Sequence, residues 1–288
     1  MTIVIAIGIA TGCVYALVGI GFSLIYRTTG IVNFAQGVFV ALGGMSAYWL
    51  TSVKDWPYAL ALVAAVGLSA LAGLALWLLV VLPLWRRGAE QVSVLMATLV
   101  AGALATALLQ KWLGSQPRTL PEWIAGLRLK LPGGSITGQY ALVVIATVVL
   151  VVVLAAFLRW STLGRSMRAC AASRETAALL GISPERIGAL AMMLSAALGG
   201  LAGILIAPAQ YTATDATVYG IFGFVAAVLG GFGTLIGPVI GGIVVGLVQA
   251  FVGRYGNVEY ETLTVFALLL ILMTFRPQGI LGSQWSDH

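Results

Sequence analysis

Charged side chains are scarce in this chain of 288 residues: Asp, Glu, Lys and Arg make up 8% of it, while 60% of the residues are hydrophobic. A soluble domain carries about 25% charged residues, because its surface must be covered by solvated side chains. The composition therefore excludes a soluble globule and predicts an all-α, polytopic membrane protein with one transmembrane domain over residues 1–288. The net charge of +6 then reports orientation in the membrane, and we expect no nucleic-acid partner.

Histidine, cysteine and lysine are also rare, and each scarcity excludes a chemistry. The single histidine is His288, the last residue, and Cys13 and Cys170 fall in different kinds of segment, so we expect neither a metal site nor a disulfide. The three lysines follow Val, Gln and Leu, so no phosphate-binding loop ends in Gly-Lys-Ser/Thr and this chain is not expected to hydrolyse ATP. No Gly-x-Ser-x-Gly motif and no Ser/His pair supports an enzyme, and we expect no cofactor.

No charged residue lies in the middle of an apolar run, whereas proton-coupled carriers usually need one for their relay. Together with the missing phosphate loop, this indicates a transporter that takes its driving force from another chain. The alternative is a self-contained secondary carrier or channel, such as one coupled to sodium through backbone carbonyl oxygens.

Uncharged runs of about 20 residues are long enough to cross the hydrocarbon core of a membrane. The spans predicted from such runs are 2–26, 28–53, 56–85, 91–110, 140–158, 187–207 and 258–275. A further uncharged stretch, 218–253, is too long for one span and is broken by Gly and Pro within 230–238. It is either two short spans or includes a half-helix that enters and returns, so we predict eight or nine membrane helices, some of them broken.

Orientation follows from Lys and Arg, which are commoner on the cytoplasmic side. With the N-terminus outside, nine of the 15 basic residues lie inside, whether the chain crosses eight or nine times. This places the segment 159–188 on the inner face. The proline-containing segment 111–139 becomes an outer loop, with a short helix expected near 122–124.

The inner segment 159–188 is a polar island that holds five of the 15 basic residues. Ser173 is suited to cap a helix over Arg174–Leu180 that ends at Gly181 in the left-handed conformation. Ser183 and Pro184 then begin the next helix. One interpretation is a basic loop held on anionic lipid; the apolar residues at the end of the short helix favour a helix that docks on another subunit.

Two other stretches are candidates for the path of a solute. Asn33 and Gln36, placed in the second span, either line the path or make hydrogen bonds between helices. The glycines of 230–246 have three Gly-x-x-x-Gly spacings, which favour close helix packing. The functional alternative is a broken helix beside a cavity, and it places four glycines on the path: Gly230, Gly231, Gly233 and Gly237.

Several motifs, in this order along the chain, resemble the branched-chain amino-acid ABC transporter permeases of the LivH type. The first two read Gly19-x-Gly-Phe-x-Leu-Ile-Tyr26 and Gly30-Ile-Val-Asn-Phe-Ala-Gln-Gly37. The others lie in residues 163–171, 178–182, 227–242 and 276–282. Gln36 is a departure, since many relatives carry histidine at this place.

The resemblance implies a multi-pass permease of the bacterial inner membrane that imports a small polar solute, a branched-chain or related amino acid, by alternating access. It implies four kinds of contact: a second, LivM-like permease, two cytoplasmic ATPase subunits that bind the ATP, a periplasmic substrate-binding protein, and membrane lipid. The outer loop 111–139 is then periplasmic. The island becomes a cytoplasmic coupling loop, with a coupling helix between the fifth and sixth spans. The residues expected to meet an ATPase are Arg165, Arg168, Arg174, Glu175, Leu179, Leu180 and Gly181.

Overall fold

The computed structural model describes residues 1–123, 127–131, 134–210, 212, 217–257, 259–276 and 278–281. The helices are α1 (Thr2–Thr29), α2 (Gln36–Tyr48), α3 (Tyr58–Leu76), α4 (Leu82–Arg86), α5 (Gln91–Leu113), α6 (Gly138–Trp160), α7 (Thr162–Ala172), α8 (Arg174–Leu179), α9 (Pro184–Ile206), α10 (Thr217–Gly230), α11 (Ile236–Tyr255) and α12 (Tyr260–Phe275). Two π-helical turns, η1 (Trp49–Val53) and η2 (Trp77–Val81), extend α2 and join α3 to α4. The described strands are β1 (Arg128–Leu131) and β2 (Gly134–Thr137), which form an antiparallel hairpin.

Six described helices are long and apolar enough to cross a membrane: α1, the continuous helix formed by α3, η2 and α4, and then α5, α6, α9 and α11. Five of them coincide with predicted spans to within a few residues at each end, and α11 lies in the ambiguous stretch around 218–253. The expected all-α, polytopic fold is confirmed. The helices α2, α10 and α12 are apolar but shorter. The number of crossings, eight or nine, stays a prediction.

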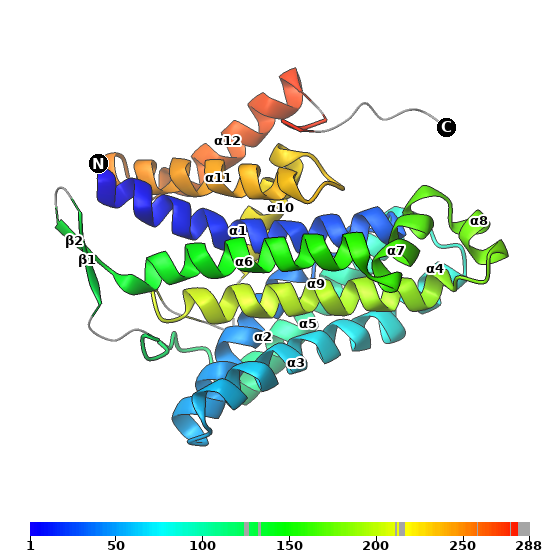
Figure 1. Ribbon diagram of the computed structural model, residues 1–288, viewed down its shortest axis with the longest axis horizontal. Coiled ribbons are helices and arrows are strands. Elements are labelled where there is room, and N and C mark those ends of the chain that lie inside the picture. The colour runs from blue at the N-terminus through cyan, green and yellow to red at the C-terminus, as the bar shows by residue number, and fades with distance from the viewer. Residues whose placement is uncertain are drawn as a thin grey trace.

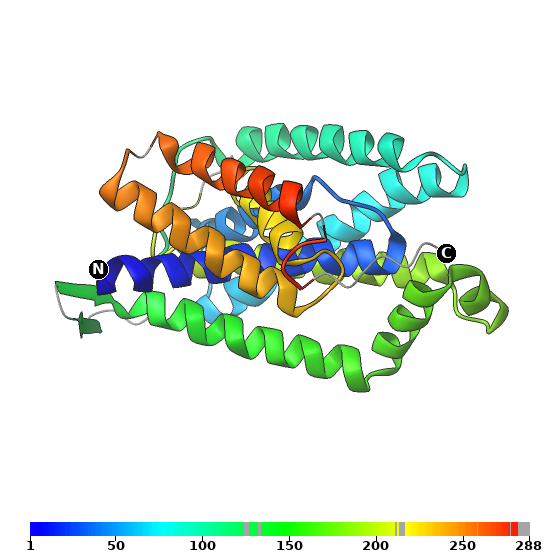
Figure 2. The same ribbon diagram turned by 90° about the horizontal axis from the view of Figure 1, so that it is seen from above.

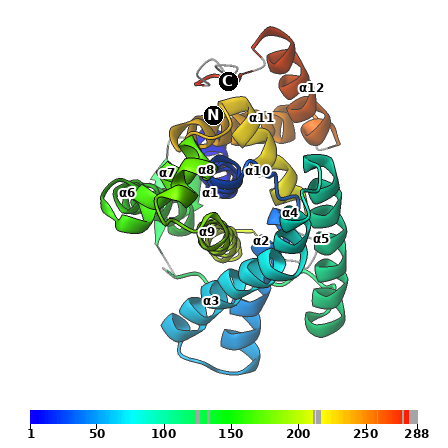
Figure 3. The same ribbon diagram turned by 90° about the vertical axis from the view of Figure 1, so that its right-hand side faces the viewer.

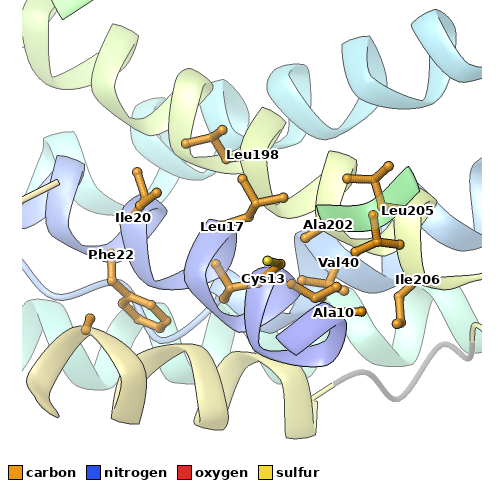
Figure 4. Close-up of a cluster of buried hydrophobic side chains, with 14 of the residues drawn as sticks. Ala10, Cys13, Leu17, Ile20, Phe22, Val40, Leu198, Ala202, Leu205 and Ile206 are labelled. Atoms are coloured by element: carbon orange, nitrogen blue, oxygen red, sulfur yellow. The ribbon is translucent and has the colours of Figure 1, made fainter. Parts of the chain in front are cut away.

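α1 and α9 form the centre of the bundle, and the other long helices surround them (Figure 1). Seen along the bundle in Figure 3, α6 and α5 lie on opposite sides, α3 lies at the bottom, and α11 and α12 cover the top. Figure 4 shows how Leu17 and Ile20 of α1 meet Leu198 of α9 in the buried cluster between these elements.

Small residues explain why α1 is central and α6 peripheral, although both helices are apolar on every face. α1 carries glycines along its length, and small residues allow helix backbones to approach closely. α6 has one glycine, Gly138 at its start, and a run of valines. Val148, Val149 and Val152 of that run are more than half exposed, which suits a surface that faces lipid.

Glycines join α11 to α1, and the two helices lie side by side in Figures 1 and 2. A Cβ atom added at Gly12 would lie 2.6 Å from the carbonyl oxygen of Gly242, and one added at Gly246 would overlap the backbone of Gly8 and Gly12. The favoured interpretation of the Gly242–Gly246 spacing, close packing, is therefore confirmed. Gly233 instead lies in a turn at φ 83° with no atoms near its added Cβ, so the Gly233–Gly237 spacing is not a packing motif.

The second predicted span is wrong at its start. α1 continues to Thr29 and ends at Gly30, which adopts the left-handed conformation (φ 66°). Residues 30–35 are not helical, and α2 begins only at Gln36. Asn33 accepts a hydrogen bond from the backbone N–H of Ala35 (3.1 Å), a local bond that competes with helix formation. Non-helical backbone of this kind is tolerated at depth only where protein or water covers it.

The ambiguous stretch 218–253 contains two helices, α10 and α11, joined by a turn at 231–235. With 14 residues, α10 is about 21 Å long, shorter than the hydrocarbon core. The C-terminal tail closes over this turn: the N–H groups of Ile280 and Leu281 donate to the carbonyl oxygens of Leu229 and Gly230 at 2.9 and 3.0 Å. The end of α10 is thereby capped by the tail.

The outer loop differs from its prediction as well. Its described part holds the β1–β2 hairpin and no helix between Gly114 and Trp123; residues 124–126 lie outside the described part. Backbone bonds between Arg118 and Thr212, at 2.7 and 2.8 Å, tie this loop to the segment after α9. The Arg118 guanidinium also lies 5.5 Å from the ring centre of Tyr48, so the loop is fixed over the end of α2.

Candidate functional site

The polar island folds as two short helices at the end of the bundle opposite the N-terminus (Figures 1 and 2). Ser173 caps α8 by accepting a hydrogen bond from the backbone N–H of Thr176 (3.2 Å), and Gly181 follows at φ 81°. The side chain of Ser183 accepts a bond from Arg186 N at 3.5 Å, with Pro184 in the first turn of α9. The predicted caps are confirmed, and the short helix ends at Leu179, one residue earlier than expected.

The other island helix, α7, was not predicted. Ser161 caps it by accepting a bond from Gly164 N at 2.9 Å. Gly164, Met167 and Cys170 are buried on one face, a spacing of three residues that matches a helical turn. Ser161 and this spacing are the sequence signals from which α7 could have been predicted.

An apolar cluster attaches the island to the membrane helices. It joins Met167 and Cys170 of α7 and Ala177 of α8 to Leu24 of α1 and Ile187 of α9. Burial raises the pKa of the Cys170 thiol, although the nearby Arg174 opposes the shift, so the thiol stays neutral and packs as an apolar group. The island is therefore packed directly against the ends of α1 and α9.

Two island arginines form hydrogen bonds with backbone groups elsewhere in the same chain. Arg168 donates to the carbonyl oxygens of Leu158 and, at 3.3 Å, Arg159, which are left without helical partners at the end of α6. Arg174 donates to the carbonyl oxygen of Thr29 at the end of α1. The Arg174 guanidinium also lies 5.4 Å from the ring centre of Trp85, and burial lowers its pKa. These contacts give both arginines an anchoring role within the chain.

The remaining island candidates face outward. Leu179 and Leu180 are 89% and 74% exposed, while Ala177, on the inner face of the same helix, is buried. Arg165, Glu175 and Gly181 are exposed too. The structure thus divides the seven predicted residues into an anchor, Arg168 and Arg174, and five exposed residues. Glu175, Leu179, Leu180 and Gly181 form an exposed tip at α8, and Arg165 lies in the first turn of α7. Their predicted contact with an ATPase stays a prediction.

We expect Arg174→Gln to loosen α8 from the end of α1. A hydrogen bond to a charged group contributes about 1.5–3 kcal/mol, and about 1.4 kcal/mol is a factor of ten, so its loss makes local opening at least about tenfold more frequent. Hydrogen exchange at the α8 amides should rise by that factor. Arg165→Gln is the matched control, because Arg165 is exposed and gives the island the same loss of charge. Equal exchange in the two variants would contradict the anchoring role.

Two candidates for the solute path, Asn33 and Gln36, contact α9. The Gln36 amide donates to the carbonyl oxygen of Ser195 (2.9 Å) and accepts from the Ser195 hydroxyl (2.9 Å), and Asn33 Nδ2 lies 3.4 Å from the sulfur of Met192. Both side chains are fully buried. In this chain they make hydrogen bonds between elements, and their place on a path stays a prediction.

Aromatic rings surround the non-helical segment that carries Asn33. Phe34 lies 5.1 Å from Phe224 of α10 and 6.3 Å from Phe22 of α1, measured between ring centres. Phe224 in turn lies 5.8 Å from Phe232 in the glycine turn. The non-helical segment 30–35 and the glycine turn at 231–235 are therefore connected through this aromatic cluster, although they are about 200 residues apart in sequence.

The four glycines of the predicted path have two kinds of surroundings. A Cβ added at Gly230 would overlap the backbone of Gly237, so these two positions are a packing contact between α10 and α11. Gly231 and Gly233 have positive φ angles of 111° and 83° and form the turn itself. Their place on a solute path stays a prediction as well.

The sequence reasoning missed a cavity with both polar and apolar walls at the end of the bundle that holds the N-terminus; it is called the outer cavity after the predicted orientation. Its volume is about 940 Å³, and it lies between α1, α10, α11 and α12. Tyr15 donates a hydrogen bond to Gln249 Oε1, and Gln249 Nε2 donates to Glu261 Oε2 at 3.0 Å. Tyr15 and Gln249 are 234 positions apart, so no local pattern signals the pair. Within the described residues no group of three or more His, Cys, Asp or Glu side chains is arranged to hold a metal ion.

A bundle with six described helices long and apolar enough to cross a membrane defines the class: a multi-span integral membrane protein. A family model described as the permease component of branched-chain amino acid transport systems matches residues 4–274. The chain therefore belongs to this permease family.

Individual relatives agree with the family model. The high-affinity branched-chain amino acid permease LivH of Salmonella typhimurium is 30% identical over 96% of this chain and 93% of its own. BraD of Pseudomonas aeruginosa is 30% identical over 96% of this chain and 94% of its own. LivM of Escherichia coli K12 is 32% identical over 41% of this chain and 28% of its own. No solved structure matches the chain.

Proposed function

We propose that this chain is the permease subunit of an ABC importer that moves a branched-chain or related amino acid across the bacterial inner membrane. The observation that carries the proposal is the 30% identity to LivH and BraD across nearly the full length of both chains. Solute moves by alternating access, and ATP is bound and hydrolysed by two partner subunits. A periplasmic binding protein delivers the solute, and a second permease, related as LivM is, completes the pore.

The island supports this proposal because its exposed tip carries two apolar side chains. Leu179 and Leu180 are apolar side chains at the extramembrane end of the bundle, where exposure to water is unfavourable unless a partner covers them. Glu175, on the same helix, adds a negative charge. The tip inserts into the ATPase, and the Arg174 contact with the end of α1 carries its movement to the central helix.

A transport experiment tests the proposal directly. The chain is purified through an affinity tag from membranes that express the whole transport system, and its partners are identified. Vesicles with the intact complex should take up leucine only when ATP and the binding protein are supplied. The chain alone should give no flux. Robust flux through the chain alone, without ATP, would favour a self-contained carrier or channel.

A further inference from the structure

The outer cavity is built like a small-molecule site. Its volume of about 940 Å³ lies within the range of about 300–1,000 Å³ for such sites. The N-terminus of α1 lies at this end, away from the island (Figure 1). Met1, Val218 and Tyr255 line the cavity and are more than half exposed, so it opens to the outer surface. Tyr15 closes it from within and is 2% exposed.

A chain of hydrogen bonds positions one carboxylate in this cavity. The Tyr15 hydroxyl is held by Gln249 Oε1, which directs the Gln249 amide N–H group to Glu261 Oε2. A carboxylate has about four acceptor positions, so Glu261 retains acceptor capacity after this bond. A Cβ atom at Gly253 would overlap Glu261 Oε1, so the glycine leaves space for this orientation. Glu261 is thus a fixed and partly buried acceptor for a cation.

A positive charge lies on the same cavity. Arg254 is in the last turn of α11, is exposed, and lines the cavity with Glu261. In the described part of the chain these two side chains form no ion pair with each other. A guanidinium pairs well with a carboxylate, and an ammonium group supplies three donors to a carboxylate such as Glu261. The cavity therefore offers both charges to one small zwitterion.

Part of the remaining wall is aliphatic, beside the polar side chains of Thr11, Gln210, Tyr219 and Tyr255. Ile3, Val4 and Ile7 come from α1, and Val218 and Ala250 come from α10 and α11. Burial of an aliphatic side chain against such a wall contributes about 0.8 kcal/mol for each methylene group. Opposite charges beside an aliphatic wall match the chemistry of an α-amino acid with an aliphatic side chain.

We propose that this cavity is an outer binding site for the transported amino acid, in which Glu261 binds the ammonium group and Arg254 binds the carboxylate. Tyr15 and Gln249 are positioning residues, because they act through Glu261. The inference rests on the proposed function for the class of solute. It adds a site on the permease itself, at the end where a solute is received before the central helices admit it.

Cysteine protection tests the site in the full-length chain, in membrane vesicles that contain the whole transport complex. Cys13 and Cys170 are first replaced by alanine; both are buried. Val218→Cys then places a thiol on the rim, and a methanethiosulfonate reagent is added from outside. L-Leucine should slow labelling at least threefold. Isopentylamine and 4-methylpentanoate, which each lack one charge of leucine, should protect less, and Glu261→Gln should remove protection by leucine.

Two further variants keep the test decisive. Ser52→Cys, on the exposed η1 turn away from the cavity, should be labelled at the same rate with and without leucine. Ile3→Cys is a second reporter on the wall, for use where Val218→Cys fails to insert. Unchanged labelling at both wall positions would overturn the proposal.

Other outcomes also decide the matter. Equal protection by 4-methylpentanoate and leucine would overturn the role of Glu261. Labelling that is slow without leucine, and faster when phosphatidylethanolamine is replaced by phosphatidylcholine, would assign the cavity to a lipid head group and overturn the proposal. ATP-driven uptake by the wild-type complex is measured in parallel. Uptake without protection rejects this site alone, whereas absence of any amino-acid uptake rejects the proposed function.

Discussion

Replacement of Leu179 and Leu180 together by aspartate is expected to abolish ATP-driven uptake and to leave the amount of inserted protein unchanged. The two side chains are 89% and 74% exposed in this chain, so their loss removes no packing within it. Each buried leucine contributes about 1.5–3 kcal/mol, and about 1.4 kcal/mol corresponds to a tenfold change in affinity. Without these anchors the ATPase should bind at least a hundredfold more weakly.

The measurements are leucine uptake by vesicles and the yield of ATPase that copurifies with the tagged permease. Leu179→Met with Leu180→Met is the matched control, since methionine keeps an apolar side chain of similar volume. It should retain uptake and copurification near the wild-type values. Wild-type uptake in the double aspartate variant would show that the tip of α8 is not the point of coupling.

The helix ends were predictable where local chemistry determines them. Ser173, Gly181 and Ser183 each act on a backbone group within three residues, so the sequence alone indicates where α8 and α9 begin and where the short helix stops. The long spans were predictable for a similar reason, because every residue of an apolar run contributes to the same signal. The break at Gly30 was missed because it lies inside an uncharged stretch.

The roles of the island arginines required the structure. The sequence shows that Arg168 and Arg174 are basic, but their partners are backbone carbonyl oxygens of Leu158 and Thr29, and no side-chain pattern marks a free carbonyl. The outer cavity required it too. Tyr15 meets Gln249 only because α11 packs against α1, and that packing joins residues 234 positions apart, while Glu261 reaches Gln249 from α12.

This packing between α1 and α11 is where we expect the largest loss of stability. Gly242 contacts α1 through its backbone: an added Cβ would lie 2.5 Å from the carbonyl oxygen of Gly12 and 2.7 Å from the backbone nitrogen of Ala16. Backbone atoms of two central helices cannot rotate away as a flexible side chain does, so the helices must separate. Overpacking typically costs about 1–3 kcal/mol, and a leucine against backbone should reach the upper end.

Gly242→Leu should therefore lower Tm in detergent by about 6–12 °C, as about 3 kcal/mol does in a chain of this size. Separation of α11 from α1 should also disturb the outer cavity, because α11 carries Gln249 and Arg254. Gly67→Leu is the matched control: Gly67 lies on the exposed face of α3, and an added Cβ there meets no atom within 4 Å. Size-exclusion profiles recorded after heating steps compare the two variants with the wild type. A Gly242→Leu protein as stable as Gly67→Leu would mean that α1 and α11 separate at no cost, and the close glycine contact would not be what holds the two helices together.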